Sequence, residues 1–538
     1  MWKRKKSVES TMPIESRYSE VVIPDISFSD YIFKSLRRYG NRVAIIEAGT
    51  GRKLTFKDIE IEVLKCASAL YKHGVRKGDM VATSAWNSPE YIIVILAAAA
   101  CGATITTCNP FYTEDELRHQ LSDSQPKLVF TVTSSYQKVK NISSTISSIQ
   151  KICNLGKLDG AETYEDLVKN EDGKDFPTDI QIDPREDILF LPYSSGTTGL
   201  PKGVMLTHRN FVSSLVIFKV KTGLSLDCIY TVLPIFHMTG LLITFKALDQ
   251  GQKHLLDVRF DIEKFLANIE KYKVTSFMSV PPMLMKIVKS SLISKYDLSS
   301  LRNVGCGAAP LPMDVGESAK KKLNCNLSQG KYMFTTGWGL TEAVPVVMTH
   351  ASYSPVNSVG IVCANTQLKV IDVSTGKELG QNEHGELCVK GPQVMKGYFK
   401  NPSSTADTID ADGWLHTGDV GYYDDNELIY IIDRIKELIK YKGFQVAPAE
   451  LEATLVAHPK IFEAVVIGVP DQEAGELAKA FVVPKDPSLT KDEIHEYVAG
   501  KLTKYKHLHG GIEFRDNIEK TPSGKLLRRK LRQSIAKN

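Results

Sequence analysis

Short apolar runs alternate with amphipathic segments over about the first 350 residues of the chain. The apolar runs predict β-strands. We expect these strands at residues 43–48, 80–86, 127–133, 187–195, 274–282 and 301–311. The segments between them, such as 56–73 and 262–273, carry apolar residues at helical spacing and predict α-helices. Because strands and helices that alternate in this way favour parallel sheets flanked by helices, we expect an α/β fold with more than one sheet.

The pattern changes between residues 358 and 430, where short β-branched runs are separated by Gly, Asn and Asp turns. This texture predicts a small antiparallel barrel or sheet. A mixed α and β pattern returns after residue 433, and about 100 residues suffice for a small separate domain. We therefore expect a basic tail at 1–20, a large N-terminal domain at 21–433 with the β-rich subdomain at about 358–430, and a C-terminal domain at 434–538.

The most apolar run of the chain is YIIVILAAAACGA at Tyr91–Ala103. It is shorter than the roughly 20 residues that a membrane-spanning helix needs, so it predicts a buried helix. Ser88, Pro89 and Glu90 precede it and supply an N-cap, a first-turn proline and an acid that complements the helix dipole. We expect no transmembrane segment.

Composition and charge are those of an ordinary globular protein, with 43% hydrophobic and 24% charged residues and a net charge of +5. That charge is too small for this length to indicate nucleic acid as a partner. The basic runs Lys3–Lys6 and Arg528–Arg532 are interpreted as a solvated tail and a helix face.

The nine cysteines form no CxxC pair, which argues against a disulfide framework or a zinc site and favours a reducing compartment. No apolar region follows the basic start, so a secretory signal is not expected. Ala536-Lys537-Asn538 differs from a peroxisomal SKL address at its last residue. We expect a cytoplasmic location, with the peroxisome as the alternative.

The segment YSSGTTGLPKGV at Tyr193–Val204 has the composition of a phosphate-binding loop. It departs from the P-loop pattern G-x-x-x-x-G-K-S/T, because Pro201 precedes Lys202 and Gly203 follows it. Consecutive backbone N–H groups in a Gly-rich turn still bind anions, and Ser and Thr hydroxyls add donors. With the charge of Lys202, the loop predicts a polyphosphate site; the alternative is a flexible surface loop.

This loop resembles the signature of the adenylate-forming superfamily, which comprises acyl- and aryl-CoA synthetases, insect luciferases and peptide-synthetase adenylation domains. The resemblance covers residues 20–530 and is greatest to the 4-coumarate:CoA ligase-like acyl-CoA synthetases. Six further motifs follow in the family's order: LPIFHMTG (233–240), GCGAAPL (305–311), TGWGLTEA (336–343), GWLHTGD (413–419), IDRIKELIKYKGFQV (432–446) and KTPSGKLLR (520–528).

The resemblance implies an enzyme that uses ATP, Mg²⁺ and coenzyme A to activate a small carboxylic acid, with no nucleic-acid partner. Its ATP- or AMP-binding positions fall on Ser194, Ser195, Gly196, Thr197, Thr198, Lys202, Ala308, Thr336, Gly337, Trp338, Thr341, Asp419, Arg434, Lys440 and Gln445. Trp338 stands where the family has Tyr and can still stack on a purine. Asp419 is expected on the ribose hydroxyls, and Glu342 is the expected Mg²⁺ ligand.

The resemblance also implies two catalytic residues, Lys525 at the α-phosphate and His237 beside the acid pocket. Taken alone, His237 would be interpreted as a core residue and Lys525 as a solvent-exposed one; the order of the motifs favours the functional roles. Lys436 falls at the family's hinge, about which the C-terminal domain rotates between the two half-reactions. Arg259, Lys442 and Gly443 are the expected CoA contacts.

The acid pocket is expected at Thr239, Gly307, Gly337, Pro345, Val346 and Met348. Coumarate ligases carry an aromatic residue where this chain has Thr239, and often Gln where it has Thr336. Loss of the ring predicts a wider pocket, suited to a medium- or long-chain aliphatic acid or a bulkier carboxylate.

Four functions fit the motifs to different degrees. A CoA ligase leads, because the hinge, CoA-loop and lysine motifs are all present. A luciferase-type oxygenase shares the scaffold. An adenylation module for a carrier protein is less favoured, since no carrier-type segment follows. A non-catalytic nucleotide-binding protein is disfavoured, because Glu342, Asp419 and Lys525 are all retained.

Overall fold

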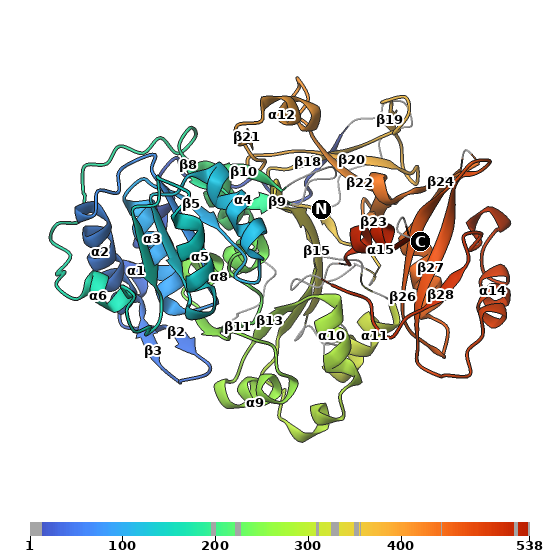
Figure 1. Cartoon of the computed structure of the whole chain (residues 1–538), viewed down its shortest axis with the longest axis horizontal. Helices are drawn as coiled ribbons and strands as arrows, with labels where there is room; N and C mark the ends of the chain where they lie inside the picture. Colours follow the sequence, from blue (N-terminus) through green and yellow to red (C-terminus); the bar gives the residue numbers. More distant parts are fainter. Residues whose placement is uncertain are drawn as a thin grey trace.

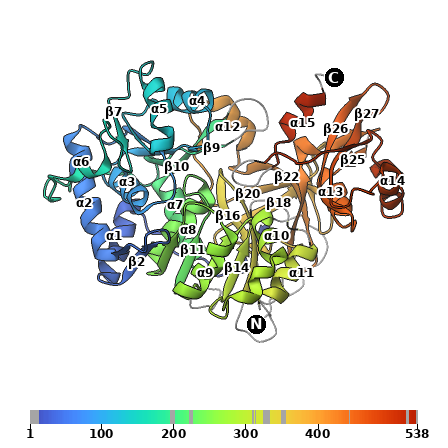
Figure 2. The same cartoon turned by 60° about the horizontal axis from the view of Figure 1, so that its bottom comes forward.

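The computed structural model describes residues 13–194, 201–220, 227–307, 311, 313–323, 333–348, 355, 357–442, 444–520 and 526–535. A large N-terminal domain of three sheets with helices is followed by a small domain at the C-terminal end, drawn in orange and red in Figure 1. In both views the small domain lies beside β22 (Leu415–Tyr423) of the large one (Figures 1 and 2). The predicted α/β class with a smaller C-terminal domain is therefore confirmed.

The first sheet has eight strands and a parallel centre. Along the sheet its strands are β21 (Gly397–Tyr398), β10 (Lys202–Thr207), β8 (Ile188–Phe190), β5 (Thr104–Thr107), β4 (Met80–Ser84), β6 (Leu128–Thr131) and β7 (Lys151–Asn154), and β9 (Tyr193–Ser194) pairs with β10. Because β10 pairs antiparallel with β9 and β21, the end of the phosphate loop lies at one edge of this sheet.

The second sheet has nine strands. In order they are β17 (Ile361–Val362), β16 (Ala343–Met348), β15 (Met333–Leu340), β14 (Asn303–Cys306), β13 (Ser276–Ser279), β11 (Cys228–Thr231), β12 (Lys253–Leu256), β2 (Val43–Glu47) and β3 (Lys53–Thr55). The run from β2 to β15 is parallel, whereas β16 returns antiparallel to β15. This return carries the TGWGLTEA motif.

Helices cover the two sheets and pack between them. The N-terminal domain contains α1 (Phe28–Tyr39), α2 (Phe56–Lys72), α3 (Pro89–Ala100), α4 (Glu114–Ser124), α5 (Thr133–Ser143), α6 (Tyr164–Val168), α7 (His208–Phe218), α8 (Met238–Asp249), α9 (Ile262–Tyr272), α10 (Pro281–Lys289), α11 (Met313–Lys322) and α12 (Pro402–Thr408). Phe28 joins α1 to α7, α8 and β8 through edge-to-face contacts with Phe190, Phe211 and Phe245. These rings, all fully or almost fully buried, fix where α8 lies.

Helix α3 confirms the buried helix expected from the most apolar run. Its residues are almost all buried, and the Ser88 hydroxyl accepts from the Tyr91 N–H at the predicted N-cap. Among the described helices, none combines the length and the apolar character that crossing a membrane requires.

The third sheet is antiparallel throughout and confirms the change of pattern near residue 358. Its strands are β1 (Ile14–Glu15), β18 (Gln367–Ile371), β20 (Gly385–Lys390), β22 and β23 (Ile429–Arg434), and β19 (Glu378–Leu379) pairs with β18. Strand β1 lies in the segment expected as a basic tail and is held by backbone pairing to β18. Asp419 on β22 lies directly opposite Arg434 on β23.

The C-terminal domain has its own core around a five-stranded sheet. It contains β24 (Ile439–Tyr441), β25 (Phe444–Val446), α13 (Pro448–Val456), β26 (Ile461–Asp471), β27 (Gly475–Pro484), α14 (Lys491–Ala499), β28 (Ile512–Phe514) and α15 (Arg528–Ile535). The basic run predicted as a helix face forms α15, where Arg528 pairs with Glu452 and Arg532 with Glu437. These arginines therefore stabilise the domain.

Candidate functional site

A cavity of about 4310 Å³ separates the sheets of the N-terminal domain from the C-terminal domain. It brings together residues that lie far apart in the sequence. Of the predicted site residues, those lining it are Ser194, Lys202, His237, Thr239, Arg259, Gly307, Thr336, Gly337, Trp338, Thr341, Glu342, Pro345, Met348, Asp419, Arg434 and Lys436.

Asp419 is a buried carboxylate in this cavity. Its side chain is 6% exposed, and Arg434 Nε lies 2.7 Å from its Oδ1. The Trp338 indole N–H donates to Oδ2 at 2.9 Å. Trp338, which stands where the family has Tyr, therefore positions the Asp419 carboxylate as well as presenting an aromatic ring. Charge-assisted hydrogen bonds of this kind are stronger than neutral ones, so the Asp419 carboxylate is held in one orientation.

Glu342 is a second buried carboxylate, 8% exposed, in the turn between β15 and β16. The Ser194 hydroxyl donates to its Oε1 at 2.7 Å and the Tyr398 hydroxyl at 3.0 Å. Burial, and then the Glu342 charge, raise the pKa of the Tyr398 phenol, so it stays a donor. Among the described residues no group donates to Oε2. A hard carboxylate oxygen that faces the cavity suits Mg²⁺, which fits the predicted role.

Lys202 completes this polar group. Its ammonium donates to the Ser404 hydroxyl at 2.9 Å and lies 5.0 Å from the centroid of the Tyr398 ring. Ser194, Lys202 and Tyr398 come from β9, β10 and β21, which pair with one another. Antiparallel pairing therefore brings a cation and two hydroxyls to the edge of the first sheet, and both hydroxyls donate to Glu342 of the second sheet.

The other end of the cavity is mostly apolar and lies along α8. His237 immediately precedes this helix, and Thr239, Leu242, Ile243 and Lys246 present its surface to the cavity.

Close packing fixes the start of α8. A Cβ on Gly240 would lie 2.1 Å from the Pro234 carbonyl oxygen, so only glycine allows this approach. Across the cavity, a Cβ on Gly307 would meet Met278 Cε at 3.1 Å. Pro345 and Met348 line the cavity, whereas Val346 is fully buried in the core and does not.

The two predicted lysines of the C-terminal hairpin lie elsewhere. Lys440 and Lys442 are exposed, on and just after β24, and neither lines the cavity. The C-terminal domain instead faces the cavity with Phe462–Ala464, Lys520 and Leu526–Arg528. Outside the described residues lie Ser195, Gly196, Thr197, Thr198, Ala308, Gly443, Lys525 and the side chain of Gln445.

Three residues at the site were not anticipated from the sequence. Tyr398 and Ser404 lie more than 190 residues after the phosphate loop that they contact, and no spacing signal connects the two segments. Lys246 did carry a signal, since it follows Thr239 and Ile243 at helical spacing within an apolar stretch.

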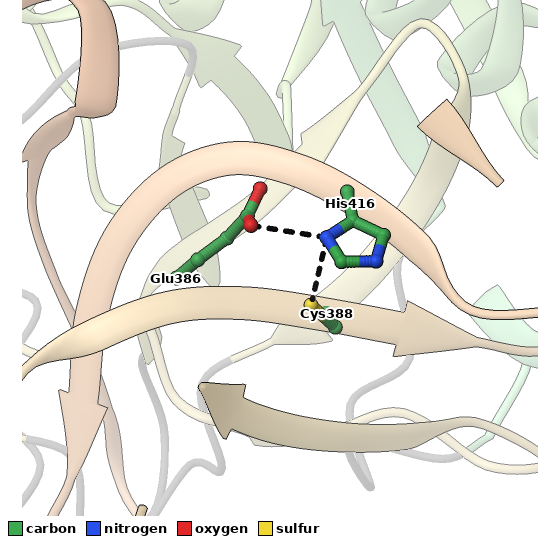
Figure 3. A group of neighbouring side chains, drawn as sticks. All are labelled: Glu386, Cys388 and His416. Carbon is green, nitrogen blue, oxygen red and sulfur yellow. Dashed lines mark hydrogen bonds and ion pairs between the residues drawn. The ribbon is translucent and has the colours of Figure 1, made fainter. Parts of the chain in front are cut away.

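One group of side chains in the third sheet has the composition of a metal site. Glu386 Oε2 lies 3.0 Å and Cys388 Sγ 3.6 Å from His416 Nδ1 (Figure 3). Such nitrogen, sulfur and oxygen ligands suit zinc, not Mg²⁺. Burial raises the pKa of the Cys388 thiol, which keeps it protonated, and Glu386 Oε1 accepts from the Gly418 N–H at 2.9 Å. The group therefore braces the turn that leads into Asp419.

Comparison with known families matches two models to this chain. The AMP-binding enzyme model covers residues 32–399, and the AMP-binding enzyme C-terminal domain model covers residues 450–525. Among curated proteins, a 4-coumarate–CoA ligase of Pinus taeda is 40% identical over 532 residues, with 96% of this chain and 97% of the relative covered. 4-coumarate–CoA ligase 1 of Arabidopsis thaliana is 38% identical over 556 residues, with 100% of this chain and 98% of the relative covered.

Comparison with solved structures points to the same family. ATP-bound MatB from Rhodopseudomonas palustris superposes with a TM-score of 0.85 at 26% identity, covering 95% of this chain and 99% of that one. The o-succinylbenzoate CoA synthetase MenE of Bacillus subtilis, in complex with the acyl-adenylate intermediate OSB-AMP, gives a TM-score of 0.80 at 29% identity, covering 93% and 97%. The resemblance stated from the motifs is confirmed over nearly the whole chain, which belongs to the AMP-binding enzyme family.

Proposed function

We propose that this protein is an ATP-dependent carboxylic acid–CoA ligase. It converts an acid and ATP to an acyl adenylate and pyrophosphate, and then transfers the acyl group to coenzyme A with release of AMP. The observation that carries the proposal is one cavity with two unlike ends: the carboxylates of Asp419 and Glu342 with Lys202 at one, and the apolar face of α8 at the other. The ligases and synthetases among its relatives and structural neighbours support the same reaction.

The polar end meets the main difficulty of the first half-reaction, in which two anions must approach each other. Lys202 supplies a positive charge and Ser194 a hydroxyl at the end of the phosphate loop. Asp419, held by Trp338 and Arg434, accepts from the ribose hydroxyls. Mg²⁺ bound through Glu342 would neutralise phosphate charge. Donors and charges fixed in advance need not reorganise as the reaction proceeds.

The second half-reaction requires a different neighbour at the same site. Lys440 and Lys442 are exposed, do not line the cavity and follow the exposed residue Lys436, where the family has its hinge. We infer that rotation of the C-terminal domain about Lys436 brings this hairpin to the acyl adenylate and to coenzyme A. Arg259, exposed at the edge of the cavity, is the proposed partner of a CoA phosphate.

The acid itself is proposed to be a medium- or long-chain or bulky carboxylate. Thr239 leaves space where coumarate ligases have an aromatic ring, and Leu242, Ile243 and Met278 supply an apolar lining. Apolar contact area, rather than stacking, would then bind the acid.

The test is acid-dependent pyrophosphate exchange over a panel of hydroxycinnamates, aliphatic monoacids and diacids, followed by CoA-dependent release of AMP. The proposal requires both activities with at least one acid. Exchange without CoA-dependent AMP release would contradict the ligase. Coumarate as the best acid of the panel would overturn the proposed substrate class but not the reaction.

Lys525→Ala tests the assigned catalytic residue. We expect adenylation to fall by roughly 10²–10³, since one preorganised donor is worth about that much. Thioester formation from supplied acyl adenylate should change far less. The matched control is Lys485→Ala, which removes an exposed lysine of the same domain that does not line the cavity. Equal loss in both half-reactions would count against the role of Lys525.

A further inference from the structure

A lysine, Lys246, lies among the apolar side chains at the α8 end of the cavity. Lys246 lies on α8 three residues after Ile243 and seven after Thr239, so the three side chains fall on one face of the helix. All three line the cavity. A lysine in the stripe that forms the acid pocket is unlike the leucine and isoleucine around it.

The surroundings of Lys246 offer its ammonium little compensation. The group lies 4.3 Å from the centroid of the Phe218 ring, which is a cation–π contact. Among the described residues it makes no hydrogen bond or ion pair. Burial lowers the pKa of Lys246 to about 8, and no nearby charge opposes this effect.

The acid closest to Lys246 along the helix is already engaged. Asp249 pairs with Lys219 at 2.7 Å and accepts from the hydroxyls of Tyr31 and Ser35 at 3.2 Å. Lys219 and Asp249 also line the cavity, as does Arg38 at the end of α1. The local charge that faces the cavity is therefore positive, and a ligand has to balance it.

We propose that Lys246 binds a second carboxylate at the far end of the acid, so that the preferred substrate is a dicarboxylic acid with an apolar middle. This inference rests on the proposed ligase function and specifies its substrate. A half-buried cation that has no ionic partner among the described residues is costly. A charge-assisted hydrogen bond to a carboxylate recovers that cost when the substrate binds. An apolar residue would serve a plain fatty acid better.

The helix sets the length of this substrate. Lys246 follows His237 by nine residues, which is about 13 Å along the axis at 1.5 Å per residue. Carbon–carbon bonds of about 1.5 Å in a zigzag advance roughly 1.25 Å each. At most about ten bonds therefore separate the carboxyl group that reacts near His237 from the one that meets Lys246, since a helical side chain leans back toward the start of its helix. The class is a medium-chain α,ω-dicarboxylate.

The experiment compares decanedioic acid, its monomethyl ester and decanoic acid in pyrophosphate exchange. The variants are Lys246→Met, which removes the charge and keeps the length, and Lys246→Arg, which keeps the charge. Lys271→Met is the matched control, because Lys271 makes a similar contact with Tyr272 at 4.9 Å but is exposed and does not line the cavity.

We expect the natural sequence to prefer the diacid to both neutral-tailed acids. Lys246→Met should lower kcat/KM for the diacid by roughly ten- to a hundredfold, the range for a hydrogen bond to a charged group. The same variant should leave kcat/KM for decanoic acid unchanged or raise it. Lys246→Arg and Lys271→Met should keep the preference for the diacid. The proposal is overturned if Lys246→Met lowers kcat/KM equally for all three acids, or if it leaves the ratio of kcat/KM between the diacid and decanoic acid unchanged. If no acid supports exchange in any variant, the ligase function itself fails.

The pH dependence gives a readout that a structural role would not produce. As pH rises through about 8, the Lys246 ammonium of the free enzyme loses its proton, so the preference for the diacid should decline. The neighbouring charges are Lys219 and Asp249, which neutralise each other, and Arg38. In Lys246→Arg the preference should persist to higher pH. A diacid preference that does not change with pH in the natural sequence contradicts the proposal.

Discussion

The two ends of the cavity are built on opposite principles. At the polar end, where we propose that the nucleotide binds (the nucleotide end), the side chains hold one another. Trp338 and Arg434 hold Asp419, while Ser194 and Tyr398 hold Glu342. At the acid end the lining is mostly apolar, and Lys246 has no described ionic partner. Stabilising a transition state needs groups fixed in advance, whereas selecting a substrate needs a surface that the substrate completes. Under the proposed function, the polar end therefore determines the reaction and the apolar end selects the substrate.

The largest effect should follow from removing the fixed charge at the nucleotide end. Glu342→Gln keeps an oxygen that can accept from Ser194 and Tyr398 but removes the negative charge. We expect adenylation to fall by roughly 10²–10³ and the Mg²⁺ requirement to rise. Pyrophosphate exchange measured over a range of Mg²⁺ concentrations checks this. Glu473→Gln, in the exposed turn before β27, is the control. Full activity of Glu342→Gln at low Mg²⁺ would show that Glu342 only supports the fold.

A smaller effect should follow from removing one of the hydrogen bonds that hold the Asp419 carboxylate. Trp338→Phe keeps an aromatic ring but removes the N–H that donates to Oδ2. We expect KM for ATP to rise roughly tenfold or more, since a hydrogen bond to a charged group is lost, with little change in the ratio between acids. Initial rates over ATP concentration with two different acids measure both quantities. In Trp338→Tyr, which restores the family's residue and a hydroxyl, the increase should be smaller. A change in acid preference without a change in KM for ATP would mean that Trp338 belongs to the acid end.

The smallest effect should follow from reshaping the acid end without touching its charge. Thr239→Tyr introduces the ring that coumarate ligases carry, into a wall otherwise formed by Leu242 and Ile243. We expect the ratio of kcat/KM for coumarate to that for decanedioic acid to rise by about tenfold, the scale of a change in pocket size. Competition between the two acids gives this ratio directly, and Thr239→Ser serves as the control of similar size. An unchanged ratio would place the acid away from the start of α8.

The arrangement of elements followed from local patterns. Apolar spacing predicted α2 and α9 to within one residue, because capping and apolar spacing act within a few residues of each other. The start of α3 was predicted from its cap, but the helix ends three residues before the apolar run does. The antiparallel third sheet was also predicted, from β-branched runs and their turns. The pairing of residues 14 and 15 with this sheet was not predicted, since a two-residue strand forms only because β18 lies beside it.

The site was predictable only in part. Motif resemblance selected Asp419 and Trp338, but their hydrogen bond joins residues 81 apart, and no local rule gives such a contact. Val346 was expected on the pocket wall, yet its side chain packs in the core, because the path of β16 and not its motif decides which residues reach the cavity. Lys246 was overlooked because a lysine in an amphipathic helix usually extends to solvent.

The bond between Trp338 and Asp419 also gives this protein its own optical probe. The fluorescence of an indole whose N–H donates to a buried carboxylate depends on the charge and surroundings of that carboxylate. A ribose bound at Asp419, as proposed, would change those surroundings. Of the four tryptophans, Trp414 is buried in the third sheet beside Cys388 and provides a steadier background. Nucleotide occupancy should then be followed by intrinsic fluorescence, without a label and before any acid has been identified.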